Sequence, residues 1–203
     1  MQTEFQECVI IVYLSKIEEF IEEIFSPFPK GAHALDHSRR VYSIAEKIGA
    51  ELGADMKILL SAALLHDIGR VREKSTGVSH SILSGEMSSE FLRSIDFTEE
   101  ETKKVKETIR THRFSEGLSP TSLEGQILSD ADKLDAIGAI GIYRTIAHAV
   151  ETGVGLEGFL KHAQEKLLRL HNLMYTDIAK KMAKNRHNIL DLFVKEIHSE
   201  LEI

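Results

Sequence analysis

Apolar residues recur every three to four positions over most of the chain, which is the spacing of one face of an α-helix. The first such stripe predicts a helix over about residues 3–25, and a Pro- and Gly-containing break follows at 26–31. β-branched residues show little of the alternation that marks a strand, and the chain holds only three prolines. The pattern therefore predicts an all-α protein.

The next two helices lead into an adjacent histidine and aspartate. A second helix is expected over about residues 36–52. Asp55 is a plausible N-cap for a third helix, which carries a strongly apolar run into residues 66–67 and which Gly69 is well placed to end. The polar residues 70–78 that follow indicate a loop.

Capping signals mark the starts of two further helices. Ser79 can cap a fourth helix that contains His80. Thr98 and Glu101 have the spacing of a capping box and open a fifth helix, which is expected to run to His112.

Helical spacing resumes after a loop and continues to the end of the sequence. The expected helical segments are 123–151, 156–172 and 175–201. With 203 residues, 42% of them apolar, the chain can fill one core. We expect a single all-α domain over residues 1–203, with a motif-bearing core at about 20–150 and C-terminal helices at about 156–201.

Charge and cysteine content narrow the functional class. A net charge of −7 with interspersed signs argues against a binder of nucleic-acid polymers or anionic membranes, but it allows a small anionic ligand in a local cationic pocket. A single cysteine, Cys8, excludes an internal disulfide and suits a reducing compartment. Neither a signal-peptide pattern nor an apolar run of membrane-spanning length occurs. We expect a cytoplasmic protein whose oligomeric state is open.

The apolar run that ends in His66 and Asp67 is the strongest chemical signal. An adjacent imidazole and carboxylate are costly to bury unless a partner satisfies them. A divalent metal ion is the simplest partner, because both groups are good ligands for it. On these two residues alone, the alternative is a helix end that faces solvent.

Other positions extend this signal. His37, His80 and His112 lie on predicted helices or at their ends, and Asp132 and Asp135 are three residues apart, so they share a helix face. The residues present exclude two other kinds of metal site. A calcium loop that begins at position 130 would need glycine at its sixth position and glutamate at its twelfth, and a zinc finger would need more than one cysteine.

Three spaced motifs carry a family resemblance. His37-x-x-Arg40-Val41, then His66-Asp67, then Ala131-Asp132-Lys133-Leu134 resemble the HD-domain family of metal-dependent phosphohydrolases. The run from residue 130 to residue 144 is similar to one bacterial and archaeal subgroup. The resemblance covers roughly residues 20–150.

The resemblance implies an HD-type helical bundle with one ion held by His37, His66, Asp67 and Asp132. Two imidazoles and two carboxylates with open positions suit Mn²⁺, Fe²⁺, Mg²⁺, Ni²⁺ or Zn²⁺. A water on such an ion becomes a nucleophile near neutral pH. Asp67 can also bridge to a second ion, so one or two ions per chain are expected.

His80 and His112 remain open between two roles. Two-metal members of the family carry extra histidines after the His-Asp pair, so these residues are either ligands of a second ion or contacts to the substrate. The surroundings of His80 are similar to those in the HD-GYP class, but the Gly-Tyr-Pro sequence of that class is absent.

The remaining candidates concern phosphate binding. Cations near the site would neutralise phosphate, and each is equally a candidate for a structural ion pair; they are Arg40, Arg70, Lys133 and Arg144. We expect Asp67, Lys133 and Arg70 to be the catalytic group. Asp135 is expected to lie next to the metal ligands and orient them without binding the ion itself. His33 either lines the mouth of the pocket or is a plain loop histidine.

The sequence thus favours a metal-dependent phosphohydrolase that acts on a small phosphorylated molecule, with a nucleotide preferred. The alternative is a non-catalytic, metal-containing helical module that binds a nucleotide or a partner. A metal-dependent oxygenase on the same scaffold is a weaker third reading.

Overall fold

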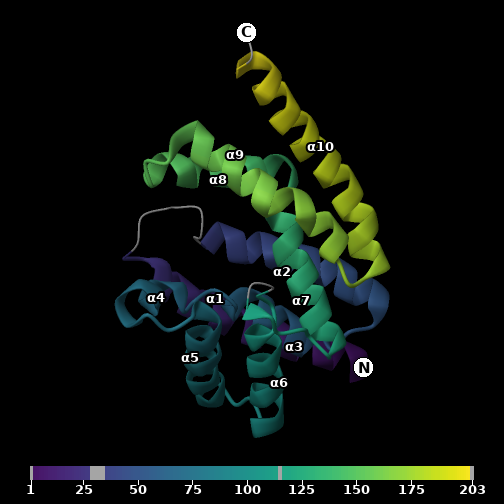
Figure 1. Ribbon diagram of the computed structural model, residues 1–203. Helices are drawn as coiled ribbons and strands as arrows, with labels where there is room; N and C mark the ends of the chain where they lie inside the picture. Colours follow the sequence, from purple (N-terminus) through teal and green to yellow (C-terminus); the bar gives the residue numbers. More distant parts are fainter. Residues whose placement is uncertain (1, 28–34, 114–115, 202–203) are drawn as a thin grey trace. The chain divides into compact units, whose positions relative to one another are not determined.

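A computed structural model describes residues 2–27, 35–113 and 116–201 (Figure 1). All regular structure within these ranges is helical, so the all-α fold class is confirmed. The chain divides into two compact units, Met1–Ser129 and Asp130–Ile203. No helix in the described ranges is long and apolar enough to cross a membrane. That residues 1–203 make up one domain stays a prediction.

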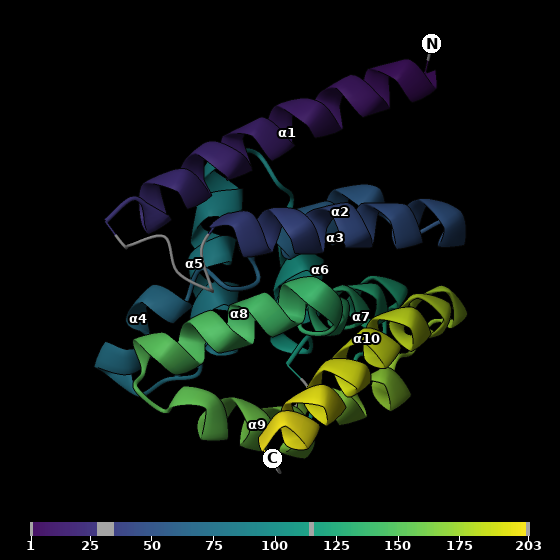
Figure 2. The same cartoon turned by 90° about the horizontal axis from the view of Figure 1, so that it is seen from above.

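The first unit is built around a short, largely apolar helix, α3 (Met56–Leu65). Its helices are α1 (Gln2–Phe25), α2 (Leu35–Leu52), α3, α4 (Arg70–Thr76), α5 (His80–Ser94), α6 (Glu99–Arg110) and the start of α7 (Leu123–Asp135). Every residue of α3 from Ile58 to Leu65 is buried. Helices α1, α2 and α6 all pack against α3, and Figure 2 shows α1 running alongside α2. Burial on all sides is what a helix with apolar residues on nearly every face requires.

The predicted caps are confirmed and explain where three helices start. The Asp55 carboxylate accepts the backbone N–H of Ile58 at 3.2 Å. Ser79 caps α5, and Thr98 forms a full capping box with Glu101 at the start of α6. Each of these side chains satisfies a backbone donor that has no partner within its own helix. Helices α5 and α6 then lie side by side (Figure 1).

Two local expectations in this unit were wrong. Residues 70–76 are not a loop but the helix α4, which ends where Gly77 adopts a φ of 68° and donates its N–H to the Glu73 carbonyl. None of its residues is buried, so it lacks the apolar stripe that reveals a helix in a sequence. Helix α6 stops at Arg110, so His112 lies just beyond it.

The second unit contains the rest of α7, α8 (Gly138–Glu151), α9 (Gly155–Glu165), the 3₁₀ helix η2 (Leu167–Leu173) and α10 (Asp177–Leu201). The single helix expected over residues 123–151 is broken before Gly138, whose φ of 78° is accessible mainly to glycine. The helix expected over residues 156–172 is likewise divided, into α9 and η2.

Asp130 has a structural role inside the second unit. Its carboxylate accepts the backbone N–H groups of Tyr175 and Thr176, both at 2.8 Å, and the Thr176 hydroxyl at 2.9 Å. These donors immediately precede α10, so Asp130 joins α7 to the start of the last helix.

Candidate metal centre

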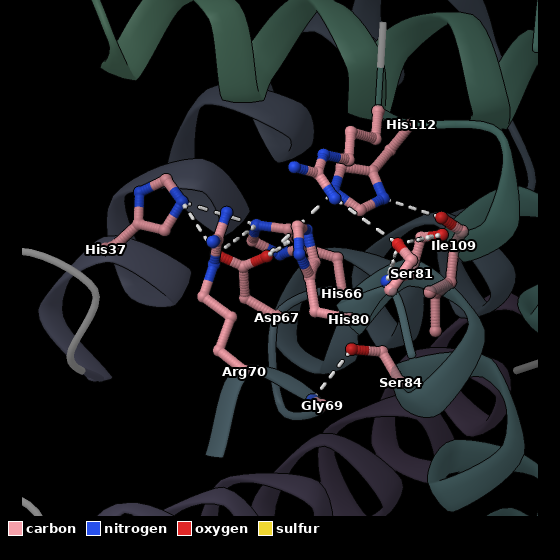
Figure 3. A network of polar contacts seen from close by, with 12 residues as sticks. His37, His66, Asp67, Gly69, Arg70, His80, Ser81, Ser84, Ile109 and His112 are labelled. Carbon is pink, nitrogen blue, oxygen red and sulfur yellow. Dashed lines mark hydrogen bonds and ion pairs between the residues drawn. The ribbon is translucent and has the colours of Figure 1, made fainter. Parts of the chain in front are cut away.

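The buried helix α3 delivers two polar side chains into the interior of the first unit. His66 and Asp67 follow its last residue, and their side chains are 0% and 1% exposed to solvent. A charged carboxylate at such a position has lost its hydration and needs compensating partners. Four histidines and one arginine lie around it, and Figure 3 shows the five side chains directed toward the carboxylate.

One oxygen of the Asp67 carboxylate faces two histidines and the arginine. The distances from Oδ2 are 3.6 Å to His37 Nε2, 3.7 Å to His66 Nε2 and 2.5 Å to Arg70 Nε. The two imidazole nitrogens are 3.3 Å from each other. Helix α2 positions His37 in its first turn, while His66 and Arg70 flank Asp67 in sequence.

The other oxygen faces a second pair of histidines. Oδ1 lies 3.3 Å from His80 Nε2 and 3.9 Å from His112 Nε2. One atom each from His66, Asp67 and His112 lie within 4.8 Å of one another, which is compatible with a shared ion. A single carboxylate is therefore flanked by two pairs of imidazoles, one pair at each oxygen.

The protonation of three of these imidazoles follows from their outer contacts. Nδ1 of His66 lies 2.8 Å from the Ala63 carbonyl, and Nδ1 of His112 lies 2.6 Å from the Ile109 carbonyl. A carbonyl oxygen can only accept, so each Nδ1 carries the proton. His80 Nδ1 likewise donates to a Glu73 carboxylate oxygen at 2.9 Å. In the neutral rings, each Nε2 then presents a lone pair toward Asp67.

The charges of the site follow from the same environment. Burial alone would raise the pKa of Asp67, but His66, Arg70, His37 and His80 hold it well below its ordinary value. Burial lowers the pKa of His80, which favours the neutral ring. Asp67 is therefore an anion whose Oδ2 accepts the Arg70 Nε–H at 2.5 Å and whose Oδ1 faces the Nε2 lone pair of His80.

This donor set fits a divalent cation. Within the described part of the chain, Asp67 Oδ1 and His80 Nε2 are buried atoms without a hydrogen-bond partner, although they lie 3.3 Å apart. Two acceptors that face each other gain nothing from their proximity. A cation that both can ligate resolves the conflict, and carboxylate oxygen with imidazole nitrogen is a suitable set for the transition metals named above.

Gly69 brings α5, and with it His80, against the metal centre. The Gly69 N–H donates to the Ser84 hydroxyl at 2.8 Å (Figure 3). A Cβ at position 69 would lie 2.5 Å from the Ser84 backbone nitrogen and 2.6 Å from the His80 carbonyl oxygen. Only a residue without a side chain permits this approach.

We therefore expect Gly69→Ala to lower the free energy of unfolding by about 1–3 kcal/mol, the usual cost of overpacking, and to displace His80 from Asp67. Chemical denaturation measures the first effect. Gly85→Ala on the same α5 is the matched control, because a Cβ there would meet only the flexible side chains of Lys106 and Arg110, at 3.3 and 3.4 Å. Equal stability of the two variants would contradict the packing argument.

The remaining predicted residues are spread over both units. Arg40 is partly buried on α2, and His33 lies outside the described residues. In the second unit, Lys133 is buried, burial lowers its pKa, and its ammonium lies 4.8 Å from the centre of the Tyr175 ring. Arg144 forms an ion pair with Asp135. The roles predicted for these residues, and for Asp132 on α7, stay predictions.

Glu73 was not among the predicted site residues. This residue lies in α4, which was interpreted as a loop, and one of its oxygens contacts both the ring and the backbone of His80. The available signal was its position three residues after Arg70, which places both on one face if the segment is helical.

Comparison with known proteins identifies the fold. The HD domain family model matches residues 34–137, which include His37, the His66-Asp67 pair and Asp132. The chain belongs to the HD-domain family. Membership supports a metal-dependent phosphohydrolase in general and an enzyme of the hydrolase kind.

Individual relatives of this HD-domain chain agree with the assignment. YpgQ from Bacillus subtilis, an uncharacterized protein, is 34% identical over 197 residues, 92% of each chain. A crystal structure of YpgQ in complex with ADP has a TM-score of 0.76 at 28% identity, covering 92% of this chain and 97% of that one. A predicted HD superfamily hydrolase from an uncultured Thermotogales bacterium has a TM-score of 0.70 at 33% identity, covering 93% of both.

A more distant similarity concerns part of a longer protein. Ribonuclease Y from Wolinella succinogenes is 34% identical over 135 residues, which are 66% of this chain but only 22% of that protein.

Proposed function

We propose that this protein is a metal-dependent phosphohydrolase that hydrolyses nucleoside phosphates. The observation that carries the proposal is the buried Asp67 carboxylate, flanked at each oxygen by a pair of histidines. The ADP complex of YpgQ supports a small phosphorylated ligand. The net charge of −7 favours a small substrate over a nucleic-acid polymer.

The ligands of the first ion would be His37, His66, Asp67 and Asp132. When bound, a divalent ion supplies a water of lowered pKa as the nucleophile and stabilises negative charge on the phosphate oxygens. Asp67 Oδ2, between His37 and His66, contributes anionic charge that favours a cation at this position. His66 Nδ1–H donates to the Ala63 carbonyl, which keeps the His66 Nε2 available to the ion.

The second pair of histidines would hold a second ion against Asp67 Oδ1. The lone pair of His80 points at an anionic oxygen, an arrangement that accepts a cation better than a phosphate, which needs N–H donors. Contact of His80 and His112 with the substrate is the alternative. Metal analysis decides between them, because the two-ion arrangement predicts two equivalents of Mn²⁺ per chain and the alternative predicts one.

Phosphate binding would fall to cationic side chains. Arg70 already lies at the rim of the site, with its side chain 30% exposed and its Nε on Asp67. Lys133, Arg40 and Arg144 are the further candidates. A guanidinium can hold two phosphate oxygens at once, whereas an ammonium acts as a point charge.

The deciding experiment is hydrolysis by Mn²⁺-loaded protein of a panel of nucleoside mono-, di-, tri- and cyclic phosphates, with and without chelator. We expect at least one nucleotide to be cleaved and chelator to abolish the cleavage. Fully metallated protein that binds a nucleotide but cleaves none would favour the binding module. Two further assays test the other readings. Cleavage of a short oligoribonucleotide, but of no nucleotide, would favour a nuclease. Oxygen consumption by the Fe²⁺-loaded protein would favour an oxygenase.

Substitutions of the two neighbouring aspartates of α7 should have different effects. Asp132→Asn is expected to lose the ion and hydrolysis. Asp130→Asn should keep the ion and lower the free energy of unfolding by about 1–3 kcal/mol, because Asp130 accepts the buried donors before α10. Metal analysis and denaturation of both variants measure this, and the reverse pattern would overturn the assignment of Asp132.

A further inference from the structure

Glu73 connects the metal centre to the surface of the first unit. Its Oε1 accepts the ring Nδ1–H of His80 at 2.9 Å and the backbone N–H of the same residue at 3.1 Å. The backbone contact fixes the place of His80 at the start of α5, and the ring contact fixes the orientation of its imidazole. Both contacts depend on α4, which presents Glu73 one turn after Arg70.

The contacts of Glu73 close a ring of four side chains. Asp67 Oδ1 faces His80 Nε2 at 3.3 Å, and His80 Nδ1 reaches Glu73. The other oxygen of Glu73 lies 3.9 Å from Arg70 Nη1, while Arg70 Nε returns to Asp67 Oδ2. The two carboxylates thus hold one imidazole and one guanidinium between them, and each of these two groups touches both carboxylates.

The charge of Glu73 is consistent with this role. Burial alone would raise the pKa of Glu73, but the hydrogen bonds from the backbone and ring of His80, together with the charge of Arg70, lower it below its ordinary value. Glu73 is therefore an anion near neutral pH, and an anion accepts only. Its short contact with His80 Nδ1 is therefore a hydrogen bond only if that nitrogen carries the proton.

We propose that Glu73 is a positioning residue of the metal centre: it holds His80 in the Nδ1–H tautomer, so that the Nε2 lone pair faces Asp67, and it supplies Arg70 with a second anionic partner. The part that concerns metal binding rests on the proposed function. A carboxylate behind a ligating histidine fixes the ring and raises its basicity, and loss of such a partner commonly weakens metal binding by about 10- to 100-fold.

A second carboxylate in the same network provides a matched control. Glu116 accepts the Ser81 hydroxyl at 2.7 Å and Arg113 Nη1 at 3.3 Å. The same Arg113 nitrogen lies 3.3 Å from Glu73 Oε1. Glu116 is also partly buried, with 19% of its side chain exposed against 32% for Glu73, but its contacts do not include the His80 ring.

The test compares Glu73→Ala, Glu73→Gln and Glu116→Gln in the full chain. Long-range ¹H–¹⁵N NMR of the metal-free protein assigns the tautomer of each histidine, and titration calorimetry with Mn²⁺ gives affinity and stoichiometry. In Glu73→Ala we expect His80 to leave the Nδ1–H tautomer and one Mn²⁺ to bind about 10- to 100-fold more weakly. Glu73→Gln keeps an acceptor oxygen and should retain the tautomer. Glu116→Gln should match the wild type in both measurements.

The outcomes distinguish the positioning role of Glu73 from the proposed metal-dependent function. An unchanged His80 tautomer in Glu73→Ala, or an equal shift in Glu116→Gln, overturns the positioning role. If the tautomer shifts as expected but the wild type binds no divalent ion, the positioning of His80 is upheld and the proposed function fails. If the wild type binds Mn²⁺ and Glu73→Ala binds it equally well, the role of Glu73 in metal binding is overturned while the proposed function stands.

Discussion

Asp67→Asn is expected to abolish both ion binding and phosphate hydrolysis while leaving the fold intact. Asparagine keeps the shape of the side chain, so packing at the end of α3 is preserved. It removes the negative charge and turns an NH₂ group toward the lone pairs of one histidine pair. One carboxylate faces both pairs, so its loss should affect every proposed ligand. Loss of a residue that only hydrogen-bonds to a metal ligand weakens metal binding by up to about 100-fold. We expect the affinity of Asp67→Asn for Mn²⁺ to fall by more than that.

Asp55→Asn is the matched control for this variant. It also neutralises one carboxylate of the first unit, but Asp55 acts as the N-cap of α3, where asparagine serves about equally well. Calorimetry with Mn²⁺ and a nucleotide hydrolysis assay should place Asp55→Asn beside the wild type. Retention of tight binding in Asp67→Asn would exclude the carboxylate as a ligand and remove the observation on which the proposed function rests.

Acidification should release the ion and with it a large share of the stability. A histidine must be neutral to bind a metal, so protonation competes with the ion, and occupancy falls as the pH falls. Burial lowers the pKa of His80 below its ordinary value of 6.5, so the His80 ring stays neutral to a lower pH than an exposed histidine. At an ion concentration about 100 times its dissociation constant, binding stabilises the folded state by about 2.7 kcal/mol.

Thermal unfolding with Mn²⁺ and with chelator, at about pH 7.5 and about pH 5, measures this effect across the histidine range. We expect the ion to raise the melting temperature by roughly 5–11 °C at the higher pH, from about 2–4 °C per kcal/mol for a chain of this size. The increment should shrink at the lower pH. An increment that is the same at both values would be evidence against histidine ligation.

Local signals in the sequence were sufficient to predict where the three capped helices begin. Asp55, Ser79 and the Thr98–Glu101 capping box act on backbone groups within three residues, so their effect could be predicted and is confirmed. Helix α4 could not be predicted in the same way. Its boundaries depend on Gly69 approaching the backbone of α5 and on Gly77 adopting a positive φ, and its polar residues carry no apolar stripe.

The sequence by itself determined the fold class and the types of residue available for a metal centre, because helical periodicity and the His66-Asp67 pair after a buried run are local properties of the chain. Only the tertiary structure decided how these residues combine. The assignment of one histidine pair to each oxygen of Asp67, and the place of Glu73 behind His80, depend on α2, α4, α5 and the end of α6 meeting around α3. Such distances arise from packing between segments far apart in the chain, which no local pattern encodes.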